Sequence, residues 1–220
     1  MGATNSLSAL TGFLITLTLA STFIIVGARR LSAAIRGAVL QGVLLAAVTA
    51  VRGWSTGIGE MYLAAGLTLV IKAGLIPYIL HKVEARVGAC PGVKSYVNMK
   101  MSFVACAGLI IVASSTTARL VGPGIGVLER ALPTAVAMML IGLFLMITRK
   151  LAINQVLGLL VMENGIFLAA VGTTNGMPPV VEVGVFLDVL AGVLIMGILA
   201  FRINRAFDTI NTEDLRNLRG

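Results

Sequence analysis

Residues 151–172 read LAINQVLGLLVMENGIFLAAVG and carry one formal charge, on Glu163. A helix needs about 20 residues, most of them apolar, to cross the roughly 30 Å hydrocarbon layer of a bilayer. This stretch has that length and is mostly apolar. Its single carboxylate is costly in hydrocarbon, but it is the only charge. The stretch therefore predicts a transmembrane helix, and it decides the class of the fold.

The remainder of the chain has the same apolar character. Of its 220 residues, 58% are hydrophobic and 12% are charged, whereas soluble domains average about 25% charged residues. A soluble core of this length could not bury so much apolar side chain. Apolar runs of transmembrane length predict an all-α, polytopic membrane protein with about seven spans, at residues 7–27, 31–51, 58–80, 101–121, 131–147, 151–172 and 180–201.

The segments between these runs are rich in glycine, proline and basic residues, and we interpret them as turns or loops at residues 28–30, 52–57, 81–100, 122–124, 148–150 and 173–176. The net charge of +8 would suggest nucleic acid in a soluble protein. Here the basic residues cluster between apolar runs, as the positive-inside rule requires, so we expect no nucleic acid partner.

The basic residues also predict the orientation of the chain. With the N-terminus outside, thirteen of the 17 Lys and Arg residues fall in cytoplasmic segments, three fall outside and Lys72 lies within a span. Under the positive-inside rule this bias favours an odd number of spans and a cytoplasmic C-terminus. We therefore expect a multi-pass protein of the inner membrane, with residues 81–100 and the tail 202–220 on the cytoplasmic side.

Three charged residues lie near the centres of their predicted spans: Lys72, Glu163 and Asp188. Each would cost roughly 2.5–3.5 kcal/mol if it faced lipid, so all three should face protein or water. Burial favours the neutral form of either group, which lets a lysine and carboxylates exchange protons near neutral pH. The sequence thus predicts a proton or ion path through these residues. The alternative is a structural pair that pins one helix against another.

Weaker polar candidates accompany them. Glu60 and Glu182 lie near the outside ends of their spans and could serve as entry or exit groups. Amide side chains could join neighbouring helices or hold water, at Asn154, Gln155 and Asn164. Pro77, five residues beyond Lys72, removes a backbone donor and could kink the helix beside the lysine.

No other pattern in the sequence carries chemistry. Cys90 and Cys106 do not have the spacing of metal ligands, His81 is the only histidine, and no phosphate-binding glycine loop occurs. We therefore expect no metal, no cofactor and no catalysis by this chain alone.

Several short motifs resemble known membrane subunits. Residues 149–165 resemble the second helix of the small K-type (4L) subunit of complex I, as does the segment from Asp188 to the C-terminus. The whole chain looks similar to component E of hydrogenase-4, through the pieces IKAGLIP at 71–77, MENG at 162–165, VEVG at 181–184 followed by Asp188, and the tail from Asp208 to Gly220.

The resemblance implies three parts: an N-terminal four-helix part at residues 1–130, a K-like three-helix part at 131–201, and a cytoplasmic tail at 202–220. It also implies a membrane-arm subunit of a complex-I-like or formate hydrogenlyase assembly. The partners would be antiporter-like and quinone-module-like subunits, and a hydrogenase-type redox arm would do the electron transfer.

The resemblance also implies where the ion path runs. K-type subunits carry two glutamates on adjacent helices, and one of these aligns with Leu160, where this chain departs from the pattern. Glu163, one turn further on, can replace it, and Asp188 stands at the other position. A purely structural linker and a stand-alone secondary transporter remain the rival readings.

Overall fold

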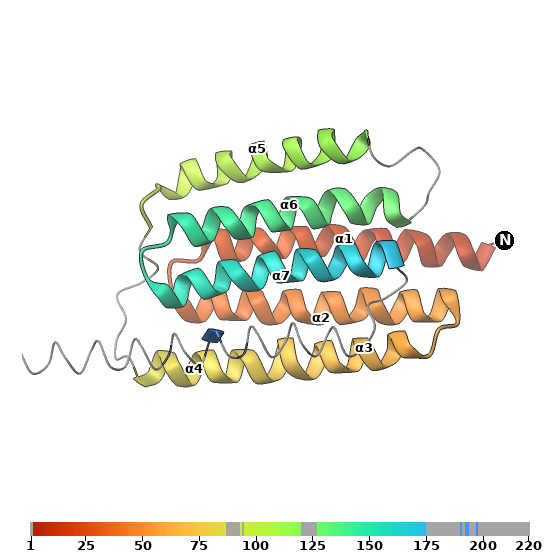
Figure 1. Ribbon diagram of the computed structural model, residues 1–220, viewed down its shortest axis with the longest axis horizontal. Coiled ribbons are helices and arrows are strands. Elements are labelled where there is room, and N and C mark those ends of the chain that lie inside the picture. The colour runs from red at the N-terminus through yellow and green to blue at the C-terminus, as the bar shows by residue number, and fades with distance from the viewer. Residues whose placement is uncertain are drawn as a thin grey trace, which may run out of the picture.

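The computed structural model describes residues 2–86, 93, 95–119 and 127–174, together with the single positions 190, 192, 193 and 197. Figure 1 shows helices that lie side by side and run alternately in opposite directions. Their bounds are α1 Gly2–Gly27, α2 Leu31–Thr56, α3 Glu60–Thr68, η1 Leu69–Leu75, α4 Ile76–Arg86, α5 Met99–Ala118, α6 Val127–Thr148 and α7 Ala152–Thr174.

The predicted all-α membrane fold is confirmed. Within the described part of the chain, six helical stretches are long and apolar enough to cross a membrane: Ser6–Gly27, Leu31–Thr56, Glu60–Lys82, Met99–Ala118, Ala131–Thr148 and Ile153–Thr173. They correspond to the first six predicted runs. The seventh, at 180–201, lies outside the described residues except at four positions, of which Val193 is buried in an apolar cluster with Leu157 and Leu160.

Several predicted loops are wrong in part, among them 173–176, whose first two residues end α7 at Thr174. Residues 52–56 continue α2, which ends at Gly57 in the left-handed conformation (φ 70°), with the Gly57 N–H donating to the Gly53 carbonyl. The hydroxyls of Ser55 and Thr56 both donate to the Arg52 carbonyl, so this polar turn satisfies its own groups and remains helical. The helix at 58–80 likewise continues through residues 81–86 as α4.

Four helices form the centre of the bundle. α1 packs on α2 and α6, α6 packs on α7, and α2 also contacts α7. α5 lies against α6, and the continuous rod α3–η1–α4 lies along α2 on the opposite side (Figure 1). Large apolar side chains remain exposed on the outer surface, as expected for helices that face lipid, including Phe13, Leu63, Val70, Val104, Ile111 and Ile147.

Glycines bring α6 and α7 into close contact. A β-carbon at Gly158 would lie 2.8 Å from the Gly142 carbonyl oxygen, and one at Gly165 would lie 2.7 Å from the Ala135 carbonyl oxygen. Small residues allow such approach, which drives helix association where lipid removes the hydrophobic effect. This contact fixes α7, the helix that carries Glu163.

The middle of the third span is not an α-helix. Residues 69–75 form the π-helical segment η1, with Lys72 at its centre, and the Ile76 N–H donates to the Ile71 carbonyl five residues back. Pro77 follows directly and cannot donate a backbone hydrogen bond, so a wider turn relieves the clash of its ring with the preceding turn. The predicted distortion near Lys72 thus takes the form of a π-helical turn.

Candidate functional site: a buried polar network across four helices

Lys72 and Glu163 form an ion pair inside the bundle. Lys72 Nζ, from η1, lies 2.8 Å from Glu163 Oε1, from α7, and the two side chains are 3% and 4% exposed. The sequence predicts that Lys72 faces protein or water and not lipid, and the structure places it beside a carboxylate. Lys72 Nζ also lies 5.1 Å from the centre of the Phe167 ring, one helical turn beyond Glu163. This arrangement offers the ammonium both a counter-charge and an aromatic face.

Asn164 extends the pair toward the N-terminal helices. Lys72 Nζ donates to Asn164 Oδ1 at 2.9 Å, and Asn164 Nδ2 donates to Gln41 Oε1 at 2.9 Å. Gln41 Nε2 donates in turn to Thr22 Oγ1 at 2.8 Å, and the Thr22 hydroxyl donates to the Thr18 carbonyl at 3.3 Å. The result is one polar network that links η1, α7, α2 and α1.

The carboxylate of Glu163 keeps acceptor capacity in reserve. Oε1 takes the contact with Lys72 Nζ at 2.8 Å, whereas Oε2 accepts no hydrogen bond from the part of the chain that the structure describes. Leaving a buried acceptor unsatisfied costs about 1–3 kcal/mol. Such a group is a natural place to hold a proton, which would turn the carboxylate into a donor.

Local sequence positions these groups. Glu163 lies eleven residues after the first residue of α7, and Gln41 ten residues after the first residue of α2, at the same end of the bundle. At 1.5 Å per residue, both side chains lie roughly 15 Å from that end (Figure 1). Gly42 lets α2 approach η1, because a β-carbon there would lie 3.2 Å from Lys72 Cβ.

The other predicted site residues do not join this network in the described part of the chain. Glu60 is exposed in the first turn of α3, twelve residues and roughly 18 Å along the rod from Lys72. Asp188 and Glu182 lie outside the described residues. Leu160, where the K-type glutamate aligns, is 5% exposed and packs in the apolar core.

The amides of α7 divide between two roles. Asn164 joins neighbouring helices, which was one of the two roles predicted for these amides, the other being to hold water. Gln155 instead donates to the Arg149 carbonyl and so closes the turn before its own helix. Asn154 is 3% exposed, and its Oδ1 accepts no hydrogen bond from the described residues.

Gln41 and Thr22 belong to the network but were not predicted from the sequence. Both are fully buried, and Gln41 links the α7 amide to α1. The signal was present, because Gln41 is the only long polar side chain in the apolar run from 37 to 48. Placing a neutral amide in hydrocarbon costs less free energy than placing a charge there. The sequence alone therefore does not indicate that Gln41 needs a polar partner.

The described residues hold no group of three or more His, Cys, Asp or Glu side chains that could bind a metal ion. A lysine and a carboxylate in contact can exchange a proton, and the amide and hydroxyl groups hold the network together by hydrogen bonds.

The chain is similar to known membrane proteins over two different lengths. Residues 131–220 match the family of NADH-ubiquinone/plastoquinone oxidoreductase chain 4L. Over 200 residues, the chain is 35% identical to the uncharacterized protein Rv0085 of Mycobacterium tuberculosis, covering 90% of this chain and 91% of that protein. It is 31% identical over 93 residues to hydrogenase-4 component E of Escherichia coli K12, covering 42% of this chain and 43% of that protein. No solved structure matches it significantly.

Proposed function

Since the chain belongs to the family of the mycobacterial protein Rv0085 and carries a chain 4L domain, we propose that it is a membrane-arm subunit of a complex-I-like assembly of the hydrogenase-4 type. In this role Lys72 and Glu163 contribute to a path for protons, or sodium ions, across the membrane. The redox chemistry resides in other subunits, which supply the energy for ion movement.

The observation that carries the proposal is the buried pair itself. Lys72 and Glu163 are each more than nine-tenths buried, at 2.8 Å, in a bundle whose helices are long enough to span a membrane. Intramembrane charges are expensive and usually mark ion or proton pathways. Glu163 lies in the 4L domain, whereas Lys72 comes from the N-terminal part, so the pair joins the two parts in one site.

The geometry suggests how a proton could move. Transfer from Lys72 Nζ to Glu163 Oε1 neutralises both groups at once, which a low-dielectric interior favours. Lys72 Nζ also contacts Asn164 Oδ1, so a neutral lysine keeps a hydrogen-bond partner while it waits for the next proton. We propose that Asp188 and Glu182 continue the path beyond Glu163, and that Glu60 and Asn164 support entry and connection.

A second candidate function has its own support. The same network ties η1, α7, α2 and α1 together, which is what a structural linker between membrane modules requires. Removal of one partner of a buried pair is strongly destabilising, by about 3–5 kcal/mol. Loss of assembly rather than loss of coupling would thus distinguish the linker from the ion path.

The deciding experiment compares Glu163→Gln and Lys72→Met with Glu84→Gln in complexes reconstituted in vesicles. Glu84 is a matched control, because it pairs with His81 near the end of α4 and outside the network. Under the proposal both network variants assemble, yet ion uptake per redox turnover falls about tenfold or more, as when a proton-transfer group is lost. Wild-type uptake in assembled Glu163→Gln complexes contradicts the ion path, and absence of the assembled complex supports the linker. Purification of the chain without any partner would instead indicate a stand-alone transporter.

A further inference from the structure

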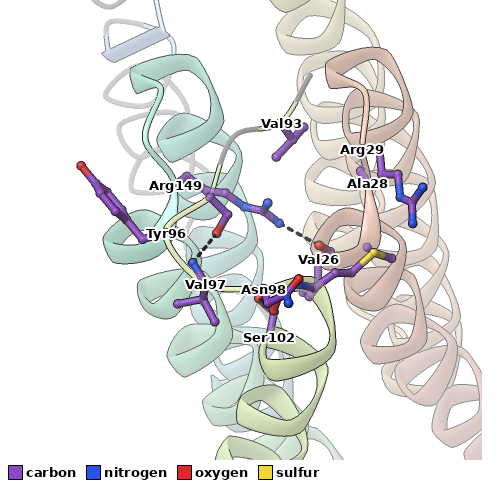
Figure 2. Close-up of a pocket in the computed structure, with 12 residues that line it drawn as sticks. Val26, Ala28, Arg29, Val93, Tyr96, Val97, Asn98, Ser102 and Arg149 are labelled. Carbon is purple, nitrogen blue, oxygen red and sulfur yellow. Dashed lines mark hydrogen bonds between the residues drawn. The ribbon is translucent and has the colours of Figure 1, made fainter. Parts of the chain in front are cut away.

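A cavity lies at the end of the bundle where α1 ends and α5 begins, away from the Lys72–Glu163 pair. Its volume is about 620 Å³, within the range of small-molecule pockets. Figure 2 shows it between the end of α1, the segment 93–98 and the turn after α6. Its lining includes two arginines, Arg29 and Arg149, with the polar side chains of Ser95, Asn98 and Ser102, and none of the described lining residues is acidic.

Arg149 is the most unusual group in the lining. It is 7% exposed, and its Nη2 donates to the Val26 carbonyl at 2.7 Å, at the end of α1. Among the described residues, its guanidinium forms no ion pair with a carboxylate. Burial lowers the pKa of Arg149 below its ordinary value, yet arginine stays protonated in proteins. A buried guanidinium therefore faces the cavity with donors to spare.

The surroundings of Arg149 also favour an anion. α5 begins at Met99, so its first backbone N–H groups and the positive end of its dipole adjoin the cavity. Asn98 uses its Oδ1 to accept from the Met99 N–H, which leaves its amide NH₂ as a donor. The exposed Arg29 adds a second positive charge at the rim.

The walls are held in place by backbone contacts. The Val93 N–H donates to the Arg29 carbonyl and the Tyr96 N–H donates to the Thr148 carbonyl, both at 2.9 Å. The Ser95 hydroxyl also donates to Thr148. These bonds fasten Val93, Ser95 and Tyr96 across the helix ends, so hydrogen bonds hold the cavity walls in place.

The position of the cavity indicates the source of the anion. It lies at helix ends, at the level where a bilayer places its headgroups, and beside it Lys150 Nζ sits 4.6 Å from the ring of the exposed Tyr96. Aromatic and basic side chains gather at this level of membrane proteins, and basic pockets between transmembrane helices bind anionic headgroups.

We propose that this cavity binds a phosphate group, as carried by the headgroup of an anionic phospholipid. Arg149 and Arg29 neutralise the phosphate, while Asn98 and the start of α5 donate hydrogen bonds to its oxygens. The bound lipid would join α1, α5 and the α6–α7 turn at one end of the bundle.

The test uses the full chain, stripped of lipid in a nonionic detergent, with thermal stabilisation as the readout. Three probes are titrated: phosphatidylglycerol, phosphatidylcholine and inorganic phosphate. The variants are Arg149→Gln, Arg29→Gln and the control Arg36→Gln, which removes the same charge from an exposed site on α2 that does not line the cavity.

We expect phosphatidylglycerol to stabilise the wild type and Arg36→Gln alike, and phosphatidylcholine to have little effect. The apparent affinity for phosphatidylglycerol should fall roughly tenfold or more in Arg149→Gln and measurably in Arg29→Gln, because each variant loses a charge-assisted contact. An equal, Arg149-dependent response to inorganic phosphate would support the site and assign it to a soluble anion. Equal stabilisation by both lipids, or no change in Arg29→Gln when Arg149→Gln fails to fold, would overturn the proposal.

Discussion

Gln41 connects the charged pair to the first helix through a single side chain. Its side chain is fully buried, accepts from Asn164 Nδ2 and donates to Thr22 Oγ1. In Gln41→Leu, the Asn164 amide loses its acceptor inside the bundle, so we expect a loss of about 1 kcal/mol of stability, as for interhelical hydrogen bonds in membranes. Thermal unfolding of the purified chain in detergent measures this loss.

The control for this prediction is Thr49→Val in the same helix. Thr49 is equally buried, but its hydroxyl donates only to the Leu45 carbonyl of its own helix. Its loss should therefore have a much smaller effect on the unfolding temperature. If Gln41→Leu unfolds no earlier than Thr49→Val, the network does not stabilise the bundle through Gln41.

At this scale the sequence predicts charges better than contacts. The cost of a charge in hydrocarbon was enough to select Lys72 and Glu163, and the structure joins them. The same reasoning could not predict that Asn164 rather than Asn154 reaches Lys72, because that depends on which face of α7 turns toward η1. Arg149 was assigned to a loop, and only the packing of the segment 93–98 shows that it is buried.

Among the helices, the α6–α7 contact is the least tolerant of added volume. We predict that Gly158→Ala destabilises the chain by about 1–3 kcal/mol, because the new methyl group would meet the Gly142 carbonyl, and backbone cannot yield as a side chain can. The displacement of α7 should also lengthen the contact between Lys72 and Glu163. Unfolding in detergent tests the first effect, and ion uptake in reconstituted complexes tests the second.

Gly108→Ala is the matched control for this substitution. Gly108 lies within α5, and a β-carbon there would meet nothing within 4 Å. It should be neutral or stabilise the helix by up to about 1 kcal/mol, since alanine favours the helix over glycine. Equal behaviour of the two variants would mean that α6 and α7 are not packed as closely as the structure shows.

Element boundaries show what the periodicity of a sequence leaves open. The polar residues 52–56 read as a loop, yet α2 continues through them because Ser55 and Thr56 bond back to Arg52. Residues 81–86 likewise remain helical, and His81 Nδ1 lies 3.2 Å from Glu84 Oε2 within this turn. The π-helical register of η1 was beyond prediction, because Pro77 indicates a distortion but not its kind.

The whole bundle places its basic segments at one end. The turn at 28–30, the end of α4 and the turn at 149–151 all lie where α1, α4 and α6 end (Figure 1). Successive spans run in opposite directions (Figure 1). The prediction that most basic residues lie on one side of the membrane assumed this alternation. Which side faces the cytoplasm is not a property of the packing, so the orientation stays a prediction that rests on the positive-inside rule.

We predict that Cys90 faces the cytoplasm. In intact cells a membrane-impermeant maleimide should leave it unlabelled, and labelling should appear only after the membrane is permeabilised. Cys106 is fully buried in α5, so it should not contribute to the signal. In a Cys90→Ser background, Ser55→Cys reports on the opposite end of α2, where Ser55 is exposed, and it should label from outside without permeabilisation. The two sites must give opposite results under the predicted topology, since the predicted span 58–80 lies between them in the sequence. Labelling of Cys90 from outside, together with protection of Ser55→Cys, would invert the bundle, and would move the proposed phosphate cavity from the cytoplasmic leaflet to the outer one.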